Sequence, residues 1–307
     1  MYVAVMALQL DLRHYETIVA IVELGTMTAA ARELHTTQSA LSHRLAEAEQ
    51  RLDRKLFDRG RQRRLTPTRA GLVLHQSAQR ALADLERSEQ ILLADRRGVT
   101  SVVRIAVGSY DCYHWYPDFL NASTRRDPDI ELDLVVGGDS PGEALAAGTV
   151  DLVLAPGAPQ GAVELTPLFV DELVLLTSPD HPLADRTHVQ AEDLVDQTYL
   201  TYNPTPTPGF EYDRFIRPGD DYPRIVRVVP QTSAIVELVA AGAGVSILSR
   251  WALAPAIDSG RIAAVPCGPT GLSLVWTVVT RRSGPSGSPT RRVAEHLATV
   301  LGSKQER

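Results

Sequence analysis

Hydrophobic and polar positions follow a helical period through the first part of the chain. Apolar residues recur at spacings of three and four along residues 11–24, which predicts an amphipathic helix that Gly25 ends. Thr28 is placed to cap a second, short helix, and Thr37 is placed to cap a third. The buried positions expected on the third helix are Leu41, Leu45, Ala48 and Leu52. Three short helices with a tight turn between the second and the third are typical of a helix-turn-helix.

A longer helix is expected to follow, capped by Thr66 or Thr68. Apolar and small residues recur along it at alternating spacings of four and three, at Leu74, Ala78, Ala81, Leu85, Ser88 and Leu92. Such a heptad seam predicts that two chains pair through this helix. Because several seam residues are small, the alternative is a helix that packs on its own domain.

Beyond Gly98 short apolar runs of strand character alternate with helical segments. The runs are residues 102–107, 132–136, 152–155, 173–176, 199–202, 225–229, 245–248 and 274–279. This alternation predicts an α/β fold in which helices cover both faces of a parallel or mixed sheet. A segment of about 200 residues is large enough for two lobes with a cleft between them.

Composition agrees with a soluble protein of several domains. A chain of 307 residues suits two or three domains, and 44% hydrophobic with 22% charged residues is typical of globular proteins. The longest apolar stretch, residues 235–248, is interrupted by Glu237 and by glycines, and it is too short to span a bilayer. No signal-peptide pattern occurs at the N-terminus, and two cysteines imply no disulfide framework. We therefore expect a cytoplasmic protein with no membrane partner.

The charge distribution favours a nucleic-acid partner although the net charge is −6. Residues 44–69 contain nine Lys or Arg and four Asp or Glu, a local balance of +5. Phosphate attraction is local, because salt screens distant charges, so a basic segment on an acidic body suits a modular DNA-binding protein. The alternative is an ordinary solvated helix face.

The polar face of the third helix carries the side chains best suited to reading DNA. Ser39, Ser42 and His43 lie at i, i+3 and i+4, and Gln38 and Arg44 flank them. Hydroxyl, amide and imidazole groups bind base edges in the major groove. Four arginines within residues 59–64 predict a hairpin wing aimed at the phosphate backbone or minor groove. The candidate DNA-binding residues are Thr28, Thr37, Gln38, Ser39, Ser42, His43, Arg44, Arg59, Arg61, Arg63, Arg64 and Thr66.

These two motifs resemble a known family. Residues 25–52 (GTMTAAARELHTTQSALSHRLAEAEQRL) resemble the helix-turn-helix of LysR-type transcriptional regulators, and residues 56–71 (LFDRGRQRRLTPTRAG) resemble their wing and the start of their linker helix. The resemblance implies operator DNA and a small-molecule effector as partners, and a homo-oligomer, either a dimer or a dimer of dimers. It also implies a winged helix-turn-helix, a dimerisation linker helix and a two-lobed effector domain like a periplasmic binding protein. The implied boundaries are 8–67, 68–97 and 101–305, with lobe I at about 101–171 and 272–305 and lobe II at about 172–271.

A second resemblance concerns the effector. Residues 104–107 (RIAV), Cys112, Trp115 and residues 200–202 (LTY) resemble the regulators of methionine biosynthesis, which respond to homocysteine. Residues 108–114 depart from the pattern of that subgroup. Another small organic acid, or a redox signal, is therefore the alternative effector.

Polar residues follow several predicted strands where ligands bind in α/β domains. Hydroxyls and helix N-termini there suit a carboxylate, which favours a small anionic or zwitterionic metabolite over a large apolar one. Each hydroxyl has the alternative role of a helix cap, and the aromatic, thiol and imidazole groups have the alternative role of packing the start of a helix. The candidate effector-binding residues are Ser109, Cys112, His114, Trp115, Thr201, Tyr202, Thr232 and Ser233.

Enzymatic function is disfavoured. The chain contains no phosphate-binding glycine-rich loop, nucleophile elbow or zinc-protease motif, so no catalytic residue and no cofactor are predicted. Cys112 and His114 are too few ligands for a closed metal site, and no metal is predicted. Cys267 lies far from Cys112 in sequence, which disfavours a thiol switch. An exported solute-binding protein would need a signal peptide and no helix-turn-helix.

Overall fold

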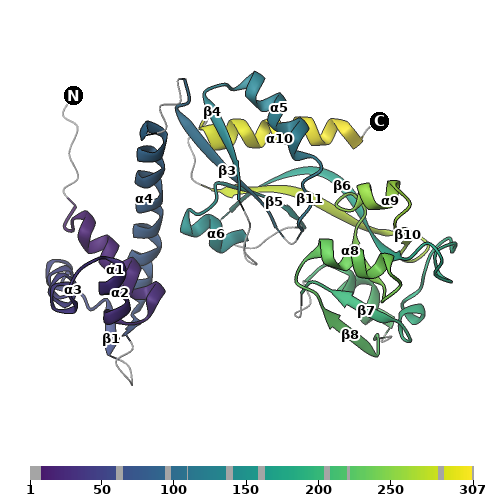
Figure 1. The fold of residues 1–307 in the computed structure, drawn as a ribbon, viewed down its shortest axis with the longest axis horizontal. Helices are drawn as coiled ribbons and strands as arrows, with labels where there is room; N and C mark the ends of the chain where they lie inside the picture. Colours follow the sequence, from purple (N-terminus) through teal and green to yellow (C-terminus); the bar gives the residue numbers. More distant parts are fainter. Residues whose placement is uncertain are drawn as a thin grey trace. The chain divides into compact units, whose positions relative to one another are not determined.

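The computed structural model describes residues 8–59, 65–93, 98–108, 110–135, 141–157, 163–203, 208–219, 222–282 and 287–305 (Figure 1). The chain divides into two compact units. The first comprises residues 1–97 with 146–149, and the second comprises residues 98–145 with 150–307. Among the described helices, none is both long and apolar enough to cross a membrane.

The first unit is a helix-turn-helix followed by a hairpin and a long helix. Its elements are α1 (Leu12–Leu24), α2 (Met27–Glu33), α3 (Gln38–Leu52), β1 (Phe57–Arg59), β2 (Leu65–Pro67) and α4 (Arg69–Leu93). Ile18 and Ile21 of α1, Leu41 of α3 and Leu56 before β1 are fully buried in one core. Strands β1 and β2 pair antiparallel, as the wing prediction requires.

Side-chain caps begin the helices of this unit. Thr37 accepts a hydrogen bond from the backbone N–H of Ala40 at the start of α3, and Thr68 caps α4 as predicted. The predicted cap of the second helix is wrong: Thr26, not Thr28, caps α2. Gly25 ends α1 in the left-handed conformation, so the next residue is already extended and is the one placed to cap.

The second unit is a mixed α/β domain. Its elements in chain order are β3 (Ser101–Val107), α5 (Tyr116–Arg126), β4 (Ile130–Leu134), α6 (Pro141–Ala147), β5 (Leu152–Pro156), β6 (Val163–Thr177), a 3₁₀ helix (Ala191–Leu194), β7 (Thr198–Thr201), a π-helix (Tyr212–Ile216), α7 (Arg217–Gly219), β8 (Ile225–Val228), α8 (Thr232–Ala240), β9 (Ser246–Ser249), α9 (Ala254–Asp258), β10 (Ala263–Pro266), β11 (Leu272–Arg281) and α10 (Pro289–Gln305). The predicted mixed α/β class is confirmed.

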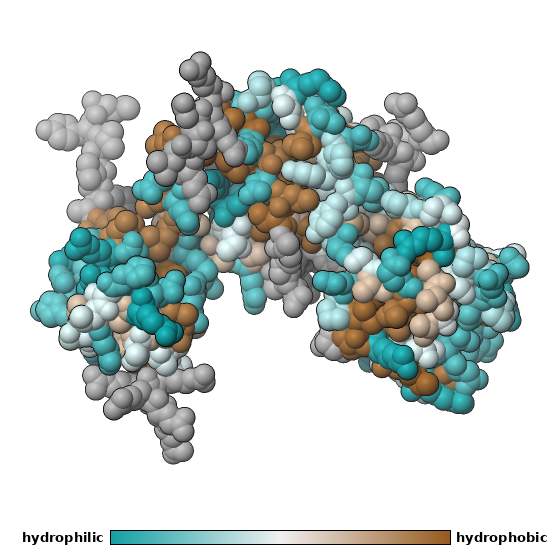
Figure 2. Space-filling view, in the orientation of Figure 1, coloured by the Kyte–Doolittle hydropathy of each residue, from teal (hydrophilic) through white to brown (hydrophobic). Residues whose placement is uncertain are grey.

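The main sheet has the order β10-β6-β11-β5-β3-β4, and β9 also pairs with β6. Strand β3 is parallel to β4 and β5, and β11 is antiparallel to β5 and β6. Strands β7 and β8 form a parallel pair. All four side chains of β8 are exposed, and the part of the molecule that holds β7 and β8 shows apolar surface in Figure 2.

Strand β6 is longer than the sequence predicts. Its first part pairs with β11, and its last part, from Leu173 onward, pairs with β9 and β10. The prediction found only residues 173–176, because polar residues and Pro167 interrupt the earlier part. Pro167 lies at a register shift in the pairing with β11, and such a bulge is one of the places where a sheet tolerates proline.

Helices cover both faces of this sheet, as predicted. Ile105 and Leu154 face a core to which Leu297 of α10 contributes, while Ala106 and Val153 face a second core that includes residues of α6. Adjacent residues of one strand thus enter different cores, because side chains alternate across a strand.

The predicted heptad seam on α4 divides into two parts. Leu74 packs against the core of the first unit, and Ala78 is only 2% exposed. Leu85 and Leu92 are 51% and 79% exposed. The alternative of packing on the helix's own domain therefore applies to the first half of the seam, whereas the second half leaves large apolar side chains at the surface.

We expect Leu85→Asp to disrupt the predicted dimer, because pairing through the second half of α4 would bury an unpaired charge, at a cost on the order of 3 kcal/mol or about 100-fold in dimer affinity. Light scattering across a concentration series measures this. The control is Val73→Asp, at a position that is 62% exposed and off the seam, and it should leave the assembly unchanged. An unchanged oligomer for Leu85→Asp would place the interface elsewhere.

Candidate DNA-binding face and effector site

Helix α3 separates its polar and apolar residues cleanly. Leu41, Leu45 and Ala48 are buried against α1 and α2. The opposite face exposes most of the predicted DNA-reading side chains, and these are Thr37, Gln38, Ser39, Ser42 and His43. Arg44 is half-buried. The structure therefore gathers the predicted residues of α3 on one accessible surface.

Two hydrogen bonds order the start of this face. Thr28 of α2 donates its hydroxyl to Oε1 of Gln38 at 3.3 Å, and the hydroxyls of Thr37 and Ser39 lie 3.0 Å apart. Thr66 is exposed on β2, and Arg59 ends β1. The remaining predicted wing residues, Arg61, Arg63 and Arg64, lie outside the described residues.

Glu49 ties the end of α3 to the wing, and the sequence analysis did not single it out. Its Oε1 accepts backbone hydrogen bonds from Leu56 at 2.8 Å and Phe57 at 3.3 Å, and its Oε2 binds Nζ of Lys55. Burial acts to raise the pKa of Glu49, but these hydrogen bonds and the lysine charge hold it below the usual value. Helix α3 and the hairpin are thereby joined through one carboxylate.

In the second unit the predicted ligand residues Tyr202 and Thr232 lie beside the segment that follows β3. The ring of Tyr110, after β3, lies 5.7 Å from that of Tyr202, after β7. The backbone N–H of Asp111 donates to the Thr232 hydroxyl at the start of α8. Ser109 itself lies outside the described residues. The ends of β3 and β7 and the start of α8 are therefore neighbours, as the position of each after a strand predicted.

The Asp111 carboxylate occupies the N-terminus of α8. Its Oδ1 accepts hydrogen bonds from the Ser233 backbone N–H at 2.9 Å and from the Thr232 hydroxyl. Gln231, the residue preceding the helix, provides no side-chain cap. Burial acts to raise the pKa of Asp111, but the hydrogen bonds from Ser233 and Thr232 lower it. The donors predicted for an effector carboxylate thus already bind a carboxylate of this chain.

A second carboxylate, Asp171 in β6, is buried beneath this region. It accepts hydrogen bonds from the indole N–H of Trp276 at 3.0 Å, from the Trp251 backbone N–H at 3.1 Å and from the Ser249 hydroxyl. The Ser249 backbone N–H in turn donates to the Tyr110 hydroxyl at 3.0 Å. Residues from β6, β9 and β11 and from the segment after β3 are joined in this way.

Aromatic rings surround Asp171, and the sequence prediction of a polar site did not include them. The ring centroid of Trp251 lies 4.8 Å from that of Trp276 and 5.0 Å from that of the exposed His114. The ring centroid of Tyr110 lies 5.6 Å from that of Trp276. These rings come from separate segments of the chain, and no local pattern in the sequence joins them.

Cys112 and Trp115 are packed inside the domain. Both belong to the main core, and the Trp115 indole N–H donates to the Cys112 carbonyl at 3.0 Å. The ring of Trp115 lies 5.8 Å from that of Phe119. Their contacts are those of the alternative role, packing the start of a helix.

Two protein-family models match this chain. The model described as the helix-turn-helix of bacterial regulatory proteins of the lysR family matches residues 12–72, and the LysR substrate binding domain matches residues 96–302. The chain belongs to the LysR family. It is a DNA-binding transcriptional regulator of the LysR type.

Relatives within the LysR family include regulators named MetR. MetR of Salmonella typhimurium is 32% identical over 262 residues, which are 84% of this chain and 81% of the relative. The regulatory domain of MetR from N. meningitidis, a solved structure, is 27% identical with a TM-score of 0.53, covering 65% of this chain and 93% of that domain. Full-length CbnR, solved with its target DNA, has a TM-score of 0.65 at 24% identity, covers 95% of this chain and all of its own, and shows the common fold.

The two thiols of this LysR-type regulator are poorly suited to redox sensing. Cys112 and Cys267 are both buried, and burial raises the pKa of each to about 12. A thiol reacts as the thiolate, so both are held in their unreactive form at neutral pH.

We expect neither native thiol to react with Ellman's reagent at pH 8, because a thiol with a pKa of about 12 is ionised to about one part in ten thousand. Both should react once guanidinium unfolds the chain. An exposed engineered thiol, Ser77→Cys, is the positive control in the folded protein. Fast labelling of Cys112 or Cys267 in the folded protein would favour the redox alternative.

The pKa values of both thiols in the folded protein lie above the value in the unfolded chain. The thiols therefore stabilise the fold below about pH 9, and that stability is lost as the pH rises towards 12.

Proposed function

We propose that this LysR-type regulator reads a pseudo-palindromic operator with α3 and its wing, under the control of a small zwitterionic metabolite. The DNA-binding part of the proposal rests on the exposed polar face of α3, which lies opposite the buried face of that helix. In this function the chain binds DNA and effector in the cytoplasm and catalyses no reaction, with no cofactor or metal. The regulators among its relatives support this reading.

Gln38, Ser42 and His43 are proposed to bind base edges, because they project from the first turns of α3. Thr28, Thr37 and Ser39 then order this face. Arg44, Arg59, Arg61, Arg63, Arg64 and Thr66 are proposed to bind phosphates or the minor groove. Two chains paired through α4, alone or as a dimer of dimers, would present two such helices to the two half-sites. CbnR, which shares the fold, was solved with its target DNA.

Loss of a base contact should weaken operator binding selectively. Ser42→Ala should cost about 1–3 kcal/mol on the operator and little on unrelated DNA, whereas Arg63→Ala should weaken all sequences and lower the salt dependence. Gel shifts at several salt concentrations measure both, with Ser77→Ala on the exposed side of α4 as the control. Unchanged operator binding by Ser42→Ala combined with Arg63→Ala would refute the assignment of α3.

The effector is proposed to bind where the ends of β3 and β7 meet the start of α8. Ser109, His114, Thr201, Tyr202, Thr232 and Ser233 would contact it, while Cys112 and Trp115 support the loop from inside. The carboxylate of Asp111 on Ser233 and Thr232 supports this site, because it demonstrates that these donors fit a carboxylate. An effector carboxylate would take the place of Asp111 there.

Homocysteine is the effector we propose first. It is a small zwitterion with a carboxylate for the α8 donors and a thiol for which the aromatic rings near Trp251 are suitable partners, since sulfur packs well against aromatic edges. The MetR relatives support the assignment to methionine metabolism. Another small organic acid remains the alternative, and the same carboxylate donors would serve it.

Effector binding changes regulation only if it favours one arrangement of the protein over another. We propose that the two arrangements differ in how lobe I (about 101–171 and 272–305) lies against lobe II (about 172–271), so that the boundaries fall near residues 171 and 272. Both boundaries fall on β6 and β11, the strands that pair along the middle of the domain. Asp171 lies at the first boundary and binds residues from either side of it.

Titration calorimetry of the full-length protein with homocysteine, methionine and related acids tests the effector site. Thr232→Ala should weaken binding about 10-fold, because a hydrogen bond to a charged group is worth about 1.5 kcal/mol or more. Asp111→Ala should instead tighten it by removing the competing carboxylate, and Thr124→Ala, on the exposed side of α5, should change nothing. Silence from every ligand, or binding undiminished by Thr232→Ala with Ser109→Ala, would refute the site.

A further inference from the structure

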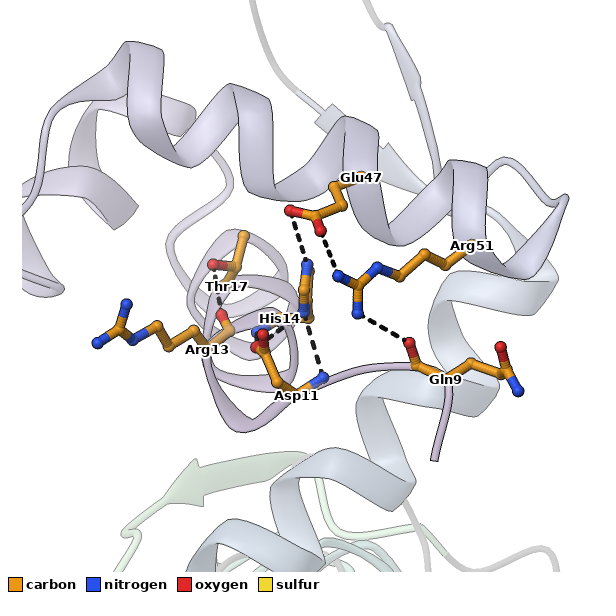
Figure 3. A network of polar contacts seen from close by, with 7 residues as sticks. All are labelled: Gln9, Asp11, Arg13, His14, Thr17, Glu47 and Arg51. Carbon is orange, nitrogen blue, oxygen red and sulfur yellow. Dashed lines mark hydrogen bonds and ion pairs between the residues drawn. The ribbon is translucent and has the colours of Figure 1, made fainter. Parts of the chain in front are cut away.

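A buried histidine lies between the start of α1 and the recognition helix (Figure 3). His14 is 2% exposed. Asp11 accepts a hydrogen bond from the His14 backbone N–H at 3.2 Å, and the Asp11 backbone N–H donates to Nδ1 of His14 at 3.3 Å. This is a reciprocal capping box in which histidine stands where glutamate or glutamine is usual. The Nδ1 side of the ring is therefore committed to α1.

The other ring nitrogen faces α3. Nε2 of His14 lies 3.5 Å from Oε2 of Glu47, and it makes no hydrogen bond among the described residues. Oε1 of Glu47 pairs with Arg51, whose guanidinium also donates to the Gln9 carbonyl at 3.2 Å. Figure 3 shows Glu47 reached from both sides, by the imidazole and by the guanidinium.

The ring can hold this position in either protonation state. In the neutral ring Nδ1 accepts from the Asp11 backbone, so the proton is on Nε2 and faces Glu47. In the charged ring Nδ1 pairs with the Asp11 carboxylate, 2.8 Å away, and Nε2 keeps its proton. In both forms the proton on Nε2 faces Glu47, while the charged form exchanges the hydrogen bond from the Asp11 backbone N–H for one to the Asp11 carboxylate.

The junction between α1 and α3 combines apolar burial with a few polar contacts. Ile18 and Leu41, together with Leu45, hold the two helices together by burial, which is non-directional, so the contacts of His14, Glu47 and Arg51 supply the directional part. Glu47 lies one turn after His43 on α3, and it is half-buried. Turning α3 by about 20° would move a side-chain end by roughly 2 Å, which is enough to break the 3.5 Å contact between His14 and Glu47.

We infer that His14 is a positioning residue for DNA reading, which sets the rotation of α3 through Glu47 and does not itself touch DNA. The inference rests on the proposed role of α3 in reading bases. The competing role for His14 is purely structural, as a capping residue that stabilises α1.

Two substitutions of His14 separate these roles. Asparagine places an oxygen near the position of Nδ1 and keeps the Asp11 contact, but it is too short to reach Glu47. Glutamine places its amide near the position of Nε2 and keeps the reach to Glu47. His14→Asn should lower the ratio of operator to nonspecific affinity about 10-fold with nonspecific affinity unchanged, and His14→Gln should retain the ratio within about threefold.

The experiment uses full-length protein, a duplex selected from a random-sequence pool by the native protein, and a scrambled duplex of equal length. Glu47→Ala, a change at a half-exposed position that should not impair folding, is expected to lower the ratio as much as His14→Asn. The double variant should be no worse than either single one, because both break the same link. Melting temperatures are recorded alongside.

Three outcomes would overturn the inference. The first is a normal ratio for both His14→Asn and Glu47→Ala, and the second is additive losses in the double variant. The third is equal losses on both duplexes that follow the melting temperature. Ser42→Ala is measured in the same assay: if it leaves the ratio unchanged, the proposed role of α3 fails, whereas a loss for Ser42→Ala without a loss for His14→Asn refutes only the positioning role.

Discussion

The buried carboxylate of Asp171 is the constraint on which the second unit depends. Removing a carboxylate from water costs on the order of several kcal/mol unless donors replace the lost hydration. Its donors are the Trp276 indole, the Trp251 backbone and the Ser249 hydroxyl, from β11 and from β9 with the residues after it. A shift of either segment would remove at least one of these donors from the buried carboxylate. Asp171 lies in β6 just before that strand changes partners from β11 to β9 and β10. Its hydrogen bonds therefore join the strands at the place where the pairing changes.

A similar principle operates at helix and strand ends. Glu49 satisfies backbone donors before and within β1, and Asp111 satisfies those of α8, in each case from another element. The two differ in consequence. The hydrogen bonds described for Glu49 lie within the DNA-binding unit, whereas Asp111 occupies the donors that we propose for a ligand carboxylate. At the proposed effector site, ligand affinity would therefore be the difference between two carboxylate contacts, so it would be sensitive to residue 111.

Features set by neighbouring residues were predictable from the sequence, and features set by distant ones were not. The α1–α3 helices, the αL Gly25 and the Thr37 cap follow from local spacing, and the mixed sheet follows from alternating runs. Thr28 was misassigned by two positions, because Thr26 is also a capping residue type. Asp111 and Ser233 are 122 positions apart, so no spacing rule joins them. The exposed polar face of α3 was foreseen, but the His14–Glu47 contact needs the packing of α1 on α3.

The two halves of the long helix α4 have different surroundings. Its first half is part of the DNA-binding core through Leu74 and Ala78, and Gln79 donates to Glu23 of α1 at 3.1 Å. Its second half exposes Leu85 and Leu92. A helix packed in this way cannot rotate its second half without carrying α1, and hence α3, with it. Pairing through the exposed leucines would therefore fix the separation and relative rotation of two recognition helices. A shift of that pairing changes which half-site spacing the pair can bind, so it can alter operator choice without changing a single base contact.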